Sequence, residues 1–196
     1  MGKIVWKPGT MLYPLPAVMV SCGHSPKTFN IITIAWTGVI NTNPPMVYIS
    51  VRPSRHSFHI LKETGDFVIN LTTKELAFAT DWNGVKSGRD HDKAAKTKLS
   101  YGKAVKIKAP IIEESPVNIE CKTTQIIPLG THHMFIAEVL AVQADEKYLD
   151  AESGKFDMQK AGLIAYVHGN YYELGKYIGH FGFSVRKKKR KNGKKK

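Results

Sequence analysis

The sequence contains few cysteines and no long hydrophobic run. Its 196 residues include 2 cysteines, Cys22 and Cys121, with neither Cys-x-x-Cys nor Cys-His spacing. The absence of such spacing argues against a zinc site or a redox dithiol and favours a reducing compartment. No apolar run approaches the roughly 20 residues that cross a bilayer, and the N-terminus lacks the apolar core of a secretory signal. We therefore expect a cytoplasmic protein that does not enter a membrane.

The sequence also lacks the motifs of the commonest nucleotide-binding enzymes. It contains neither a Gly-x-Gly-x-x-Gly fingerprint between a strand and a helix nor a Gly-x-x-x-x-Gly-Lys phosphate loop. No nucleophile with a supporting base is recognisable. These absences argue against a Rossmann-type dehydrogenase, a P-loop NTPase and a serine or cysteine hydrolase.

Positive charge is unevenly distributed along the chain. The formal net charge is +13, but nine of the eleven residues from 186 to 196 are Lys or Arg, which leaves 20 basic against 16 acidic residues in positions 1 to 185. A block of like charges is usually solvated and disordered. The sequence thus predicts one domain over residues 1–187 and a disordered basic tail over 188–196. Aromatic residues and glycines in residues 179–187 predict that this last part of the domain is packed.

Most of the remaining chain has β character. Val, Ile, Thr and aromatic residues are concentrated in runs that end near Pro, Gly or Asn. The predicted strands are residues 16–23, 29–40, 45–52, 66–71, 117–129 and 133–145. Strands and helices do not alternate, which argues against a parallel doubly wound sheet. We expect an all-β fold with short helices.

The helices that the sequence predicts are short. One runs over residues 54–64, with Ser54 as its N-cap and Gly65 at its end. A second covers residues 73–82 and begins with the capping box Thr72-x-x-Glu75. A third turn is expected over residues 92–97.

The stretch VRPSRHSFHI joins an apolar strand to the first helix. If Ser54 caps this helix, the first backbone N–H groups point toward the end of the strand and attract an anion. Ser57 adds a hydroxyl, and Arg52 and Arg55 add planar guanidinium groups that match phosphate oxygens. The stretch therefore predicts either a phosphate cradle or an ordinary helix cap with solvated arginines.

The order and spacing of several motifs resemble one known family. These motifs are NIITIAWTGVINTNPPMVYISVRPSRHSFHILKETGDFVINL, SGRDHDK, ESPVNIECK, LGTHHMFIAEV and LIAYVHGNYYELGKYIGHFGFSVRKK. Over roughly residues 12 to 187 the chain resembles the flavin reductase-like, FMN-binding split-barrel family, and its flavoredoxin-type members in particular. The resemblance implies a six-stranded antiparallel Greek-key barrel that forms a homodimer and holds FMN near the subunit interface.

The resemblance also implies roles for individual residues. Strand backbone would lie along the flavin ring at Thr33, Ile34, Ala35, Trp36 and Thr37. The phosphate would be held by the cradle of Arg52, Ser54, Arg55, His56 and Ser57. Further cofactor contacts are expected from Ser50, Asn83, Ser87, Gly88, Lys93 and His168. His132 would lie near the flavin face where nicotinamide or another donor stacks, and it is the candidate catalytic residue.

Eight histidines raise the question of a metal site. His132 and His133 are adjacent near the start of a predicted strand, so their side chains point to opposite faces and cannot both bind one ion without a bulge. We expect no metal.

Three functions remain open from the sequence. The first is an FMN-containing oxidoreductase, either an NAD(P)H:flavin reductase or a flavoredoxin-like electron carrier, so that the partner is a nicotinamide cofactor or a redox protein. The second is a nucleic-acid-binding β-barrel that uses the basic tail and stacks bases on Trp36, Tyr48, Phe58 and Tyr171. The third is a flavin-binding protein without turnover. Because the charge is concentrated in the tail and is not interleaved with these aromatic residues, nucleic acid is the less expected partner.

Overall fold

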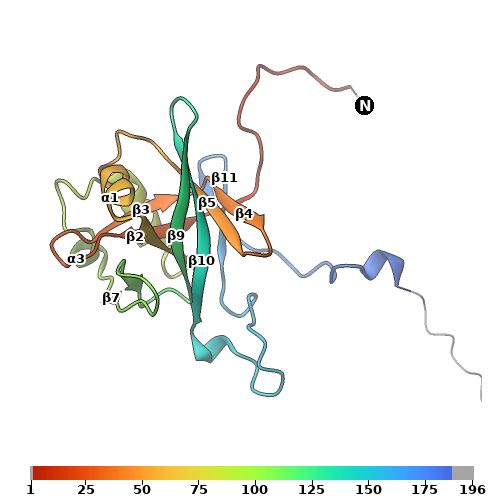
Figure 1. Cartoon of the computed structure of the whole chain (residues 1–196). Coiled ribbons are helices and arrows are strands. Elements are labelled where there is room, and N and C mark those ends of the chain that lie inside the picture. The colour runs from red at the N-terminus through yellow and green to blue at the C-terminus, as the bar shows by residue number, and fades with distance from the viewer. Residues whose placement is uncertain (1, 187–196) are drawn as a thin grey trace, which may run out of the picture.

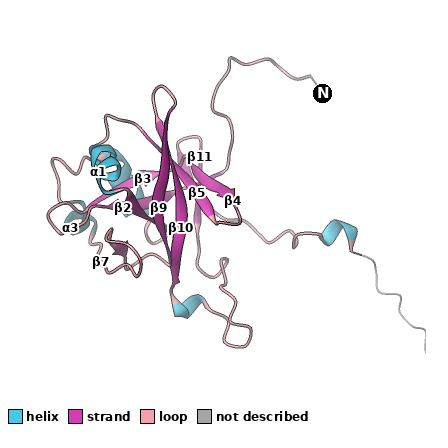
Figure 2. Ribbon diagram, viewed as in Figure 1, coloured by secondary structure: helices cyan, strands magenta, loops and turns pink. Residues whose placement is uncertain are grey.

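The computed structural model describes residues 2–186, which form a mostly-β fold with a few short helices (Figures 1 and 2). The main sheet has the strand order β3-β2-β6-β9-β10-β5-β4, and every neighbouring pair is antiparallel. Its strands are β2 (Val18–Cys22), β3 (Asn30–Ile34), β4 (Thr37–Asn41), β5 (Met46–Val51), β6 (Asp66–Leu71), β9 (Val117–Pro128) and β10 (His133–Ala144).

Two small sheets and two short 3-10 helices complete the described chain. Strands β1 (Leu15–Pro16), β11 (Ile164–Val167) and β12 (Asn170–Glu173) form one sheet, and β7 (Tyr101–Gly102) pairs with β8 (Ile111–Ile112). The 3-10 helices are η1 (Glu146–Tyr148) and η2 (Phe183–Val185).

The predicted strand over residues 29–40 is broken at Ala35 and Trp36, where the chain bends. The N–H of Thr37 donates to Ala35 O at 3.1 Å, and the N–H of Ser50 donates to Trp36 O at 2.9 Å. The run therefore supplies two strands, β3 and β4, and the main sheet has seven strands instead of the six predicted. These consecutive strands lie at the two ends of the strand order, so the sheet curves until β3 approaches β5.

Three α-helices flank the sheet: α1 (His56–Thr64), α2 (Ala77–Val85) and α3 (Lys93–Thr97). The prediction that Ser54 caps α1 was wrong, because Arg55 is the N-cap residue and makes no capping hydrogen bond with its side chain. Gly65 ends α1, as predicted, with a left-handed φ of 67° that suits glycine. None of the helices in residues 2–186 is long and apolar enough to cross a membrane.

The predicted capping box of α2 is not formed. The helix begins at Ala77, and Thr72 Oγ1 instead donates to Ala17 O across to the start of the main sheet. The helix also runs past its predicted end, so Gly84 lies inside it. A Cβ at Gly84 would approach Thr33 Cβ to 3.2 Å, so this glycine lets the helix pack closely on β3. The third helix starts as expected, since Asp92 Oδ1 accepts the N–H of Ala95 at 3.0 Å.

Two buried clusters hold these elements together. The larger lies between the curved sheet and α1 and includes Ile49, Leu61, Phe67 and Phe135. The smaller packs the helices α2 and α3 against the other side of β2 and β3, through residues that include Met19, Ile31, Leu76, Ala94 and Ile112. The helices α1 and α2 are thereby fixed on the two sides of β3, where the candidate site is found.

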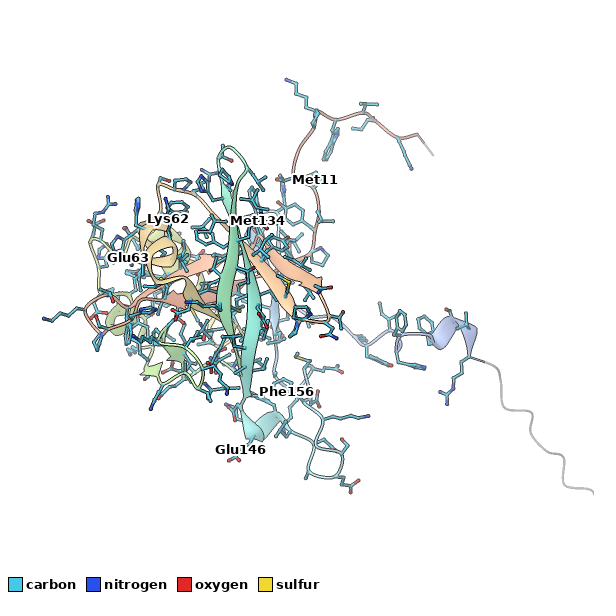
Figure 3. The ribbon with its side chains drawn as sticks, in the orientation of Figure 1. Met11, Lys62, Glu63, Met134, Glu146 and Phe156 are labelled. Carbon is cyan, nitrogen blue, oxygen red and sulfur yellow. The ribbon has the colours of Figure 1, made fainter. Side chains whose placement is uncertain are left out.

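The two terminal segments extend away from this body (Figure 1), and their side chains project into open space (Figure 3). Residues 179–187 were predicted to be packed, but in the described part of this segment Phe181 and Phe183 are 106% and 55% exposed. The expectation was wrong because these aromatic residues find no apolar surface within the described part of the same chain. The predicted tail, residues 188–196, lies outside the described residues.

Candidate functional site

A cleft of about 360 Å³, here called the central cleft, opens beside strand β3. It is bounded by the bend between β3 and β4, the end of β5, the turn before β10 and one residue of β11. The lining residues are Ile32, Thr33, Ile34, Ala35, Trp36, Ser50, Val51, Arg52, Arg55, His132 and Tyr166.

Backbone forms one wall of the central cleft. Strand β3 is at the edge of the main sheet and pairs with β2 on one side, so backbone groups on its other side are unpaired in the ladder. Ala35 adds only a methyl group, which lets a flat ligand approach the chain. Thr37, by contrast, is buried outside the cleft, where its Oγ1 donates to Tyr48 O at 2.6 Å.

The side chains of Arg52, His132 and Trp36 form another part of the lining of the central cleft. Arg52 Nε donates to His132 Nε2 at 3.3 Å, and the rings of His132 and Trp36 lie with their centroids 4.4 Å apart. Burial and then the charge of Arg52 lower the pKa of His132. The imidazole is therefore neutral at pH 7, with Nε2 as an acceptor and Nδ1 facing Thr131 Oγ1 at 3.0 Å.

A smaller cleft of about 90 Å³, here called the α1 cleft, lies where helix α1 begins. It shares Ile32 and Arg55 with the central cleft, so the two clefts adjoin. Its lining residues are Asn30, Ile32, Ser54, Arg55, His56, Ser57, Asn83, Lys86, Ser87, Gly88 and Lys93.

The α1 cleft contains cations without counter-charges. Lys93 is 5% exposed, and its ammonium donates to Ile31 O at 2.8 Å and to Asn83 O at 2.7 Å. Burial, followed by the charge of Arg55, lowers the pKa of Lys93 to about 8. Among residues 2–186, neither cation forms an ion pair with a carboxylate. An anion in this cleft would offset the repulsion between Arg55 and Lys93 and the free-energy cost of burying the charge of Lys93.

Other polar groups around the α1 cleft are tightly placed. Asn83 is fully buried, and its Oδ1 accepts no hydrogen bond from the described protein. Asn30 Nδ2 donates to Ser57 Oγ at 2.7 Å, and a Cβ at Gly88 would lie only 2.0 Å from Asn30 Oδ1. Asn83 Oδ1 can therefore accept a hydrogen bond from a hydroxyl group, whereas the cations Arg55 and Lys93 suit the oxygens of a small anion.

A buried thiol, Cys22, lies at the same corner of the sheet. Burial raises the pKa of the thiol to about 12, although a hydrogen bond with the hydroxyl of Ser57 lowers the pKa in part. Its Sγ faces Asn30 O at 3.7 Å. The thiol is thus protonated and does not add to the charge of the α1 cleft.

The structure brings most of the predicted site residues together around the two clefts. Thr33, Ile34, Ala35, Trp36, Ser50, Arg52 and His132 line the central cleft, Ser54, His56, Ser57, Asn83, Ser87, Gly88 and Lys93 line the α1 cleft, and Arg55 lines both. Two predicted residues lie elsewhere. Thr37 is buried as described, and His168 is exposed in the turn between β11 and β12, with a φ of 46° and its ring 5.7 Å from that of Tyr13.

Sequence reasoning missed several lining residues. Tyr166 takes the position expected of His168, because the β11–β12 hairpin turns Tyr166 toward β3 and leaves His168 at its tip. The sequence analysis gave no site role to four further lining residues, Ile32, Val51, Asn30 and Lys86. The polar Asn30 at the start of an apolar strand was the available signal.

The two adjacent histidines diverge. His132 faces the central cleft, whereas His133 packs edge-on against Phe58 with ring centroids 5.0 Å apart. Within residues 2–186 no three His, Cys, Asp or Glu side chains are grouped so as to hold a metal ion.

The fold defines a class, that of mostly-β split-barrel proteins. A model of the flavin reductase like domain matches residues 10–175, and the chain therefore belongs to the flavin reductase-like family. The resemblance inferred from the sequence motifs is confirmed.

Solved structures and relatives agree with this assignment. The flavoredoxin of Desulfovibrio vulgaris (Miyazaki F) is 26% identical with a TM-score of 0.86, over 94% of this chain and 100% of that protein. The flavoredoxin of Methanosarcina acetivorans is also 26% identical, with a TM-score of 0.84 over 95% of this chain and 100% of that one. An uncharacterized protein of Archaeoglobus fulgidus is 28% identical over 141 residues, which are 72% of this chain and 78% of the relative.

Proposed function

We propose that this protein is an FMN-binding oxidoreductase that transfers electrons through the bound flavin. The observation that carries the proposal is the pair of uncompensated cations, Arg55 and Lys93, in a cleft that adjoins a larger cleft walled by edge-strand backbone. A phosphate joined to a flat ring by a short chain has the shape and charge that these two clefts accept. The 26% identity to flavoredoxins over nearly the whole chain supports the same assignment.

The phosphate of FMN would lie in the α1 cleft. Lys93 and Arg55 would donate charge-assisted hydrogen bonds, and the first N–H groups of α1, together with the hydroxyls of Ser54 and Ser57, would complete the anion site. Asn83 Oδ1 would accept a hydrogen bond from a hydroxyl of the ribityl chain, so that this buried oxygen would gain a partner. These residues fit the phosphate end of the cofactor.

The ring of FMN would lie in the central cleft. When bound, FMN supplies a ring that takes up a hydride or single electrons. The backbone along β3 would hydrogen-bond the polar edge of the ring, while Trp36 and Tyr166 would exclude water. His132 would stay neutral beside it, so that a donor such as NADH, NADPH or a reduced protein meets no extra positive charge at this point.

The test begins with the purified protein. Bound flavin is measured by absorbance, and NADH and NADPH oxidation are then followed with and without added FMN. Flavin binding with turnover supports a reductase, and flavin binding with reduction only by a protein donor supports a flavoredoxin-like carrier. Flavin binding without reduction by any donor would favour a non-catalytic flavin-binding protein, and no flavin binding would refute the proposal.

FMN affinity is expected to decrease as pH rises above 8. Lys93 has a pKa of about 8 in the ligand-free protein, and a neighbouring phosphate favours its protonated form. FMN binding then takes up a proton above pH 8, so the Kd should increase by up to about tenfold per pH unit until the pKa of the complex is reached. Burial and Arg89 lower the pKa of His56, which is therefore already neutral in this range. The Kd of FMN is measured from pH 7.5 to 9.5, with riboflavin as the control, and an equal slope for both ligands would contradict the prediction.

We also propose that the protein is a two-fold homodimer in the cytoplasm. A flavin in the open central cleft would leave much of its ring in water, and the segment 174–186 exposes Ile178, Phe181 and Val185 by 91%, 106% and 82%. A second subunit would cover both surfaces. Cys22 and Cys121 are free thiols, as is usual in a reducing compartment.

Light scattering of the flavin-loaded protein should therefore give about twice the chain mass of 21.9 kDa. Truncation after residue 174 should shift the mass toward the monomer, because it removes the exposed apolar segment. A monomer with full flavin occupancy would contradict the proposed dimer.

The nucleic-acid alternative has less support. Of its four aromatic residues, Phe58 is buried at 5% exposure, Trp36 packs against His132, and Tyr171 donates its hydroxyl to Asp81 at 3.3 Å. They do not form one open stacking surface, so no described feature favours this function.

A further inference from the structure

A third cleft, here called the α2 cleft, lies between the last turn of α2 and the β11–β12 hairpin. Its volume is about 280 Å³, against about 360 Å³ for the central cleft. Thr33, Ala35 and Tyr166 line both clefts, so the two share a wall. The proposed binding of FMN uses the central cleft and the α1 cleft and leaves the α2 cleft free.

Asp81 is the only charged residue among the described residues that line the α2 cleft. It is exposed, and within residues 2–186 its carboxylate forms no ion pair. The hydroxyl of Tyr171 donates a hydrogen bond to Asp81 Oδ1 at 3.3 Å. A carboxylate accepts several hydrogen bonds, so one long bond from a phenol leaves most of this capacity unused. The carboxylate of Asp81 therefore favours a cation in the cleft.

The end of helix α2 adds to the negative potential of the α2 cleft. Gly84 and Val85, the last two residues of the helix, are part of the lining. The last carbonyl groups of a helix together carry roughly half a negative charge and stabilise a nearby cation. The last turn of α2 contains no basic residue, and Lys86, which follows it, lines the α1 cleft instead. The described chain thus does not supply this cation itself.

Two tyrosine rings complete the lining. The centroids of the Tyr166 and Tyr171 rings are 5.8 Å apart, and their planes meet at 63°. Burial, followed by the charge of Asp81, raises the pKa of Tyr171 to about 12, so its hydroxyl is neutral at pH 7. The face of an aromatic ring attracts a cation that lies within about 6 Å of the ring centroid. An organic cation can therefore contact aromatic rings and a carboxylate in the same cleft.

A carboxylate, a helix C-terminus and two tyrosine rings around one small cleft all favour the same class of ligand. We propose that the α2 cleft binds a small organic cation that carries a substituted ammonium group. A metal ion is less suited, because within residues 2–186 no three His, Cys, Asp or Glu side chains are grouped to hold one. The inference goes beyond the proposed function and does not depend on it, since FMN would lie in the other two clefts.

The test uses choline as the probe and 3,3-dimethyl-1-butanol as an uncharged molecule of the same shape. Each is titrated into the purified full chain by calorimetry. Choline is expected to bind at least about tenfold more tightly than the alcohol, because only the cation can use both the carboxylate and the ring faces. Equal binding of the two probes, or no binding of choline, would overturn the inference.

Variants of the lining test where choline binds. Asp81→Asn removes the charge but keeps an oxygen that accepts from Tyr171, so it should weaken choline binding by at least about fivefold and change binding of the alcohol by less than about twofold. Tyr171→Leu should weaken choline binding by at least about threefold, whereas Tyr171→Phe keeps the ring and should not weaken it by more than about twofold.

The matched control for Asp81→Asn is Asp90→Asn. Asp90 is also exposed, but it lines neither the α2 cleft nor the central cleft, so its replacement should leave choline binding unchanged. If Asp81→Asn binds choline as tightly as the wild type, the cation binds elsewhere and the inference is wrong. Failure of FMN to bind would refute the proposed function alone, because the choline titrations do not require flavin.

Discussion

Replacement of Arg55 by alanine will weaken FMN binding by about tenfold to 100-fold and leave riboflavin binding within about twofold. Arg55 lines both clefts, is exposed, and within residues 2–186 forms no ion pair that the substitution would break. A charge-assisted hydrogen bond to phosphate contributes about 1.5 to 3 kcal/mol, which is the expected loss. Because riboflavin has no phosphate, it cannot use this bond.

The matched control for Arg55→Ala is Lys62→Ala. Lys62 is an exposed cation in the last turn of the same helix (Figure 3) and lines neither cleft. Both variants are titrated with FMN and riboflavin by fluorescence quenching. Equal weakening of the two ligands by Arg55→Ala would mean that Arg55 does not contact the phosphate.

Replacement of Gly88 by alanine will lower both the free energy of unfolding and the affinity for FMN. The new Cβ would lie 2.0 Å from Asn30 Oδ1 and 2.8 Å from its Cγ. Asn30 is 4% exposed and held by its hydrogen bond to Ser57, so it cannot move aside freely. Overpacking of this kind costs about 1 to 3 kcal/mol. The displaced Asn30 and Ser57 would also narrow the α1 cleft.

Two further variants test whether the contact with Asn30 causes the loss of stability in Gly88→Ala. Gly175→Ala places a Cβ with nothing within 4 Å, so unfolding in urea should be unchanged to within about 0.5 kcal/mol. Adding Asn30→Ala to Gly88→Ala removes the clashing side chain, so the two changes should be less than additive in the free energy of unfolding. Strict additivity would show that the contact between residues 30 and 88 is not responsible.

The sequence predicted strands better than the ends of helices. Runs of apolar β-branched residues mark the main sheet because each is buried on at least one face, as the fully buried β2 illustrates. The capping box at Thr72 failed because the threonine hydroxyl found a tertiary acceptor, Ala17 O, that no local pattern reveals. The break at Ala35 and Trp36 was also missed, since neither residue is a turn former and the bend depends on pairing with β5.

The residues of the candidate site were likewise predicted where the local sequence determines their position and missed where tertiary packing determines it. The residues around Arg55 were predicted together because they are consecutive where a strand gives way to a helix. His168 and Tyr166 were confused because their orientation depends on how the β11–β12 hairpin folds over β3, which the local sequence does not determine.

The reactivity of the Cys22 thiol can be used to follow the opening of the structure where β2, β3 and α1 meet. A thiol with a pKa of about 12 and no exposed surface is a poor target for oxidants and alkylating reagents, even next to the proposed flavin site. It becomes reactive only when β2, β3 and α1 separate. The labelling rate of Cys22 therefore measures how often the phosphate end of the site opens, and a bound ligand that closes this corner would slow the labelling in proportion to its occupancy.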